Sequence, residues 1–67
     1  MDLGDRKVVI HAEGPVDGGY RGYAVICWEE DGAVESRLDF HGIFISPIRA
    51  IERATAEFQR RAEAGEL

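Results

Sequence analysis

The chain has 67 residues, a formal net charge of −5 and an isoelectric point near 4.8. This length allows one domain with a small core, which often needs a disulfide, a metal or a partner subunit as a supplement. Cys27 is the only cysteine, which excludes an internal disulfide, so we expect a homo-oligomer, most simply a dimer. The acidic balance argues against nucleic-acid binding, which requires a basic surface.

Membrane and export signals are not evident in the sequence. No apolar run approaches the ~20 residues that a membrane-spanning helix needs. Residues 1–5 are acidic and contain no hydrophobic signal core. With a single cysteine, these features predict a cytoplasmic protein without membrane contact.

The first predicted strand covers residues 7–13, after a loose polar start at residues 1–6. Its side chains alternate between two faces, one beginning with Val8 and the other with Val9. Residues 14–19 are rich in glycine and end this strand.

The second predicted strand, residues 20–30, has apolar side chains on both faces, which is typical of a central strand. Asp31 and Gly32 then match the two-residue type I′ turn of a hairpin. Residues 33–44 return as the third strand of an antiparallel sheet.

The two-residue turn sets the register between the second and third strands. Val25 would lie opposite Leu38, and Tyr23 opposite Phe40, so that apolar pairs share one face. A shift by one residue would place Val25 and Tyr23 opposite charged side chains, which favours the first register.

A helix is predicted over residues 47–64, because the apolar spacing changes to three and four residues after Ser46. Ser46 is a favourable N-cap, Pro47 suits the first helical position, and Gly65 marks the end. The predicted apolar stripe consists of Ile48, Ile51, Thr55, Phe58 and Ala62.

These elements predict an α+β fold in a single domain, residues 1–67: a three-stranded antiparallel meander with one C-terminal helix packed on one face. We place the helix on the more apolar face of the sheet. The side chains on that face would be Val8, Ile10, Tyr23, Val25, Cys27, Val34, Leu38 and Phe40.

The uncovered face would carry Trp28, Ile26 and Val9 among charged side chains. Because tryptophan is enriched in protein interfaces, we expect these residues and Arg37 to contact a second copy of the chain. A sheet edge is another route to self-association. In the alternative, Arg37 and Glu35 lie over Trp28 and shield it within one chain.

A polar cluster on the same predicted face supports a different hypothesis. His11, His41 and Asp39 are residue types that bind metals or transfer protons, so they could serve a small metal- or ligand-binding enzyme. Two histidines at outward strand positions also fit a plain surface. We therefore predict no catalytic residue, no metal and no cofactor.

The chain combines a strand at residues 20–28, the Asp31-Gly32 turn, residues 44–46 and a helix with small residues. This layout resembles that of small uncharacterised bacterial β-β-β-α proteins. That resemblance implies no activity. The tyrosine-containing strand, the Asp-Gly turn and the helix are also similar to the N-terminal domain of HicB-type antitoxins, which neutralise an RNA-cleaving toxin. The first hypothesis is thus a non-enzymatic, self-associating interaction module, and the alternative is an antitoxin-like inhibitor of a basic protein.

Overall fold

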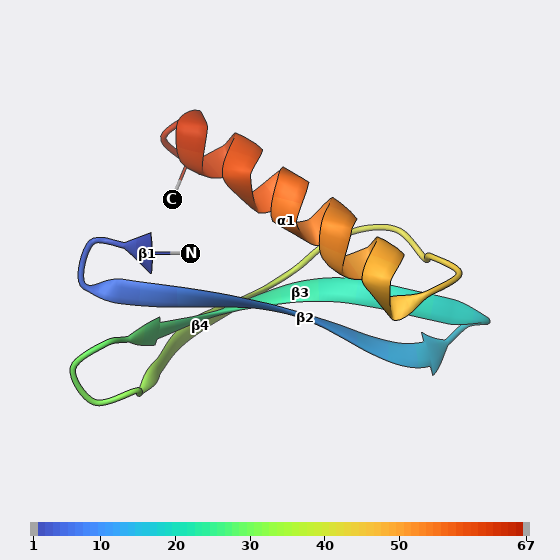
Figure 1. Ribbon diagram of the computed structural model, residues 1–67, viewed down its shortest axis with the longest axis horizontal. Helices are drawn as coiled ribbons and strands as arrows, with labels where there is room; N and C mark the ends of the chain where they lie inside the picture. Colours follow the sequence, from blue (N-terminus) through green and yellow to red (C-terminus); the bar gives the residue numbers. More distant parts are fainter. Residues whose placement is uncertain (1, 67) are drawn as a thin grey trace.

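A computed structural model of the chain describes residues 2–66 and contains one antiparallel sheet and one helix (Figure 1). The sheet has the order β1-β2-β3-β4, with bounds Asp2–Leu3, Arg6–Val16, Gly19–Trp28 and Val34–Asp39. The helix α1, Pro47–Glu63, follows the sheet and lies across one of its faces (Figure 1). The predicted α+β fold, a β-β-β-α arrangement, is confirmed, and the two-residue β1 is an addition at the edge of the sheet.

The hairpin between β2 and β3 turns at Asp17 and Gly18. Both residues have positive φ, 51° and 82°, which a type I′ turn requires and which Asp and Gly tolerate. Val16 and Gly19 pair on either side of this turn. Strand β2 therefore extends past the predicted end at residue 13, with an irregular register between Glu13 and Val16.

The hairpin between β3 and β4 does not have the predicted two-residue turn. The N–H of Trp28 donates to the carbonyl of Ala33 (2.9 Å), which leaves a four-residue loop, 29–32. Within residues 2–66 Asp17 is the only non-glycine residue with positive φ, so Asp31 lacks the conformation of a type I′ turn. Its carboxylate instead accepts a hydrogen bond from the N–H of Ala33 (2.9 Å).

A bulge at Glu35 follows this loop. Cys27 pairs with Val34, whereas the preceding residue Ile26 pairs with Ser36. Glu35 is therefore the extra residue of a β-bulge, which displaces the rest of β4 along β3.

The resulting register differs by one residue from the predicted one. Val25 lies opposite Arg37, and Tyr23 lies opposite Asp39. The prediction rejected this pairing because it sets charged side chains against Val25 and Tyr23. These charges lie on a face that the helix does not cover, so they remain accessible to water.

The helix covers the opposite face of β3 from the predicted one. Ala24 and Ile26 are buried beneath it, 0% and 4% exposed. Since side chains alternate along a strand, Tyr23, Val25 and Cys27 lie on the other face, which we call the open face. The buried core consists of Val8, Ala24, Ile26, Phe40, Ala50, Ala54 and Phe58.

Small residues explain why this face of β3 accepts the helix. A Cβ atom at Gly22 would lie 2.6 Å from the Cβ of Ala54 and 2.7 Å from the carbonyl oxygen of Ala50. The helix therefore approaches β3 more closely than any larger side chain would permit. A side chain as large as that of Tyr23, which lies on the open face, would not fit between β3 and the helix.

The ends of the helix agree with the prediction, but its apolar stripe does not. The hydroxyl of Ser46 accepts a hydrogen bond from the N–H of Arg49 (3.2 Å), and Pro47 opens the helix. Phe58 is fully buried as expected, whereas Ile48 and Ile51 are 68% and 37% exposed. The face that packs on the sheet is centred on alanines, and the isoleucines lie beside it.

Candidate functional site

The predicted interface residues do not share one surface. Ile26 belongs to the core, so it is not available to a partner in this fold. Val9 and Arg37 lie on the open face. Trp28 is the last residue of β3, and its side chain is 40% exposed on the face that the helix covers. In the sheet it pairs with Arg6. The guanidinium of Arg6 lies 5.9 Å from the Trp28 ring centre, in the position that we expected for Arg37 or Glu35.

Tyr23 is the centre of a polar cluster on the open face. The ring of His11 stacks on it at 5.2 Å between centroids, with an angle of 26° between the planes. The guanidinium of Arg37 lies 3.9 Å from the Tyr23 centroid. These contacts join all three long strands, because the residues come from β2, β3 and β4.

Two carboxylates hold Arg37 in place. It donates hydrogen bonds to Asp39 on its own strand (2.8 Å) and to Glu13 on β2 (3.0 Å). The hydrogen bond to Asp39 is the main reason why the pKa of Arg37 is raised above its ordinary value. The charges of the cluster are thus largely satisfied within the chain.

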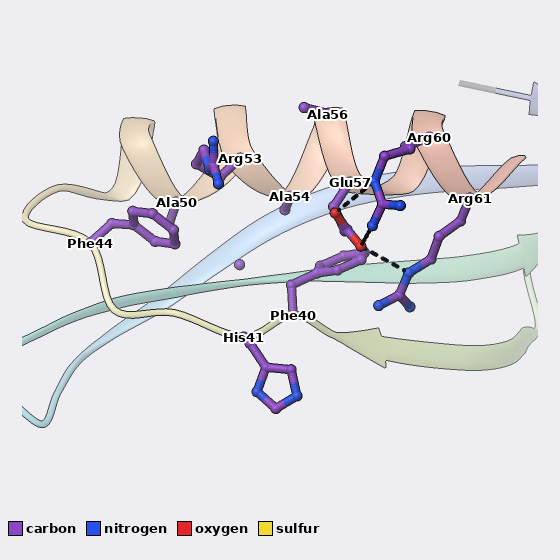
Figure 2. Close-up of a pocket in the computed structure, with 11 residues that line it drawn as sticks. Phe40, His41, Phe44, Ala50, Arg53, Ala54, Ala56, Glu57, Arg60 and Arg61 are labelled. Carbon is purple, nitrogen blue, oxygen red and sulfur yellow. Dashed lines mark hydrogen bonds and ion pairs between the residues drawn. The ribbon is translucent and has the colours of Figure 1, made fainter. Parts of the chain in front are cut away.

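The histidines and Asp39 do not converge. His11 and Asp39 pair with Tyr23 from opposite sides, which separates them by two strand spacings, about 10 Å. The side chain of His41 points away from the helix (Figure 2). In the part of the chain that the structure describes, no group of three or more His, Cys, Asp or Glu side chains could hold a metal ion.

Four exposed isoleucines gather at the end of the molecule where the helix begins. We call Ile43, Ile45, Ile48 and Ile51 the isoleucine patch; their side chains are 41%, 88%, 68% and 37% exposed. Ile45 precedes the helix, and Ile48 and Ile51 follow it at intervals of three residues. A common hollow is lined by Ile43, Phe44, Ile45 and Arg49. In Figure 1 this end lies far from β1 and from the β3–β4 loop.

A second surface is a groove of about 400 Å³ between α1 and residues 40–44 (Figure 2). The helix packs on β2 and β3 but, within residues 2–66, makes no comparable contact with β4. The aromatic residues Phe40 and Phe44 line the groove, as do Ala50 and Ala54.

An irregularity in the sheet shapes the same groove. The N–H of Phe40 donates to the carbonyl of Gly22 (3.1 Å), and Phe44 exchanges two hydrogen bonds with Tyr20 (2.8 and 2.9 Å). Residues 41–43 therefore lie opposite the single residue Arg21 and bulge out of the sheet. The predicted third strand, residues 33–44, is broken at this point.

Arginines from the helix form the rim of the groove. Arg60 and Arg61 both donate hydrogen bonds to the carboxylate of Glu57, and Arg53 lies one helical turn earlier (Figure 2). The hydrogen bond from Arg60 is the main reason why the pKa of Glu57 is lowered. These charges match no binding motif in the sequence, and the groove beside them arises from the bulge and from the strand that the helix leaves uncovered.

Comparisons with known proteins add no assignment: no protein family, curated protein or solved structure matches this chain. The helix α1, in the described residues, is not long and apolar enough to cross a membrane.

Proposed function

We propose that this protein is a non-enzymatic interaction module that self-associates through the isoleucine patch. The observation that carries this proposal is the exposure of Ile45 and Ile48, 88% and 68%. Soluble monomers rarely expose contiguous apolar patches larger than roughly a few hundred Å², and patches above that size mark contact sites. Fully burying one such side chain contributes about 1.5–3 kcal/mol.

A second copy of the chain is the occupant that fits this patch. Among residues 2–66 the core of one copy has seven buried apolar residues, of which three are alanines, so the described chain buries little apolar area. A two-fold axis would set the same apolar surface against itself, which avoids contact between the acidic parts of two copies with net charge −5. A stable interface needs about 800 Å² per partner, a modest share of the 4545 Å² that one chain exposes.

We further propose a cytoplasmic location. Cys27 is a partly exposed free thiol on the open face. Free thiols of this kind persist in reducing compartments.

A second candidate function is inhibition of a basic partner protein. Glu29, Glu30 and Asp31 form an exposed acidic loop directly after the half-exposed Trp28. The N–H of Glu29 donates to the carbonyl of Asp5 (3.1 Å), which brings a further acidic residue to this end of the molecule. Such a surface favours basic partners over acidic ones.

Sedimentation velocity tests the self-association at micromolar concentration. We expect the wild-type chain to sediment as a dimer and the variant I45S/I48S as a monomer with an unchanged circular dichroism spectrum. Val34→Ser is a matched control, because Val34 is 65% exposed at the opposite end of the molecule. A monomeric wild type would contradict the proposal, and so would dissociation by Val34→Ser or Trp28→Ala but not by I45S/I48S.

A further inference from the structure

We infer that the groove between α1 and residues 40–44 binds an acidic peptide segment of a partner protein. One large apolar side chain of the peptide would lie on the floor, and its carboxylates would pair with the arginine rim. This site is separate from the isoleucine patch and goes beyond the self-association proposed above.

The floor of the groove suits an apolar side chain. Phe44, which is partly exposed, and the ring of Phe40 lie below the helix (Figure 2). Ala50 and Ala54 are buried against Gly22 and close the inner side of the groove. Aromatic and small apolar walls gain the most from excluding water around a bound side chain.

The rim of the groove is cationic, although the chain as a whole is acidic. Three of the eight basic residues, Arg53, Arg60 and Arg61, line it, against the single carboxylate of Glu57. The side chain of Arg53 has no hydrogen bond or ion pair with another residue among 2–66. Its guanidinium is therefore available to a carboxylate, with which arginine forms paired, charge-assisted hydrogen bonds.

The remaining arginines are already ordered before any ligand arrives. Glu57 accepts hydrogen bonds from Arg60 and Arg61, and the guanidinium of Arg61 lies 5.3 Å from the ring centre of Phe40. Side chains that are held in position lose less conformational entropy on binding. The groove thus presents arginine donors, two of them already paired with Glu57, above an apolar floor.

The length of the groove favours an extended peptide over a small ligand or a nucleic acid. The helix advances about 16 Å from Ala50 to Arg61, the span of about five extended residues. The described part of the chain leaves no buried side-chain N or O atom without a partner, so nothing demands one particular small molecule. A longer polyanion such as RNA is disfavoured by the net charge of −5 of the chain.

Peptide titration followed by amide NMR tests the inference. The probe is the synthetic peptide Glu-Glu-Phe-Glu-Glu, and the expected result is shifts at residues 40–44 and 50–61. Arg53→Glu should weaken binding about tenfold or more, because a charge-assisted pair becomes a repulsion. The matched control Arg21→Glu makes the same charge change outside the groove and should bind as the wild type does.

Further measurements distinguish an acidic peptide from other classes of ligand. A peptide with lysine in place of glutamate should not bind, and Arg53→Glu should sediment as the wild type does, since the isoleucine patch is intact. No binding of the acidic peptide, or equal binding by Arg53→Glu, would overturn the inference. Stronger binding of single-stranded RNA or of phenylacetate at the same residues would also overturn it in favour of another ligand.

Discussion

The guanidinium group of Arg37 lies 3.9 Å from the centre of the Tyr23 ring. It reaches this position from β4 and continues across β3 to the carboxylate of Glu13 on β2. The contact depends on the observed register, which sets Arg37 opposite Val25. A register that appears unfavourable from cross-strand pairs alone is thus stabilised by a diagonal contact.

Replacing Arg37 with methionine should lower the midpoint of thermal unfolding by a few degrees. The variant loses the cation over Tyr23 and leaves Glu13 and Asp39 without their donor. The ring-proton resonances of Tyr23 should shift at the same time. Arg21→Met serves as control, since the side chain of Arg21 makes, among the described residues, only a long ion pair with Asp17 (3.8 Å). Unchanged Tyr23 resonances in Arg37→Met would contradict the contact.

The register itself can be checked by cross-strand nuclear Overhauser effects. We expect backbone contacts between Tyr23 and Asp39 and between Val25 and Arg37, as the bulge at Glu35 requires. Contacts of Tyr23 with Phe40 would instead indicate the two-residue turn at residues 31–32 and would refute the bulge.

The two Asp-Gly pairs show how far the sequence determines the hairpins. Both pairs fit a type I′ turn, and both lie between strands that were correctly predicted to exist. The chain uses Asp17-Gly18 for this turn, whereas the carboxylate of Asp31 accepts from the N–H of Ala33 in a four-residue loop. Local residue preferences do not distinguish these outcomes, and the choice sets Leu38 opposite Ala24 instead of opposite Val25.

Close packing, rather than total apolar area, decided that face. The sequence analysis compared apolar side chains and favoured Tyr23 and Val25. The structure buries Gly22 and Ala24 instead, because α1 approaches β3 through its own alanines. The ends of the helix, marked by the N-cap Ser46 and by Gly65 just after the C-cap, were predictable because capping depends on local sequence.

Gly22→Ala should destabilise the fold by about 1–3 kcal/mol, the usual cost of overpacking a filled core. The added methyl group would lie 2.6 Å from the Cβ of Ala54, so the helix has to move. Urea denaturation measures the loss. Arg21→Ala, at the exposed neighbouring position, should change the free energy of unfolding by less than about 0.5 kcal/mol. Equal stability of Gly22→Ala and the wild type would refute the close approach of helix and strand.

Stability should depend on pH through Glu57. Hydrogen bonds from Arg60 and Arg61 lower the pKa of this carboxyl in the folded chain below the ordinary value of 4.5. The contribution of ionised Glu57 to the stability of the fold is therefore complete above pH 4.5, and it is lost as the pH falls through the lowered pKa of the folded chain. The wild type should unfold at a higher temperature than Glu57→Gln at neutral pH, and the difference should shrink in acid. A difference that does not vary with pH would contradict this role.

Zinc should leave the histidines unaffected. His11 stacks on Tyr23, and Asp39 lies about two strand spacings away, so the separation is too large for one ion. Adding zinc while recording the imidazole resonances of His11 and His41 checks this. A joint shift of both histidines would revive the metal-dependent enzyme that the sequence also allowed.

The candidate surfaces were less accessible to prediction than the fold. An exposed apolar contact surface was expected, but around Trp28 rather than at Ile45 and Ile48. Ile48 and Ile51 fit the helical period and were therefore placed in the predicted apolar stripe, whereas Ala50 and Ala54 form the buried centre of the helix face. The arginine groove depends on the bulge at residues 41–43, whose sequence signal is Gly42 (φ 110°), a glycine inside the predicted third strand.

Isotope-filtered nuclear Overhauser spectra of a mixture of carbon-13-labelled and unlabelled chains test the self-association most directly. The proposal predicts contacts between copies from the methyl groups of Ile45 and Ile48, to the same residues of the partner. Contacts between copies that arise from Trp28 or Val34 instead, or no contact between copies at all, would contradict it.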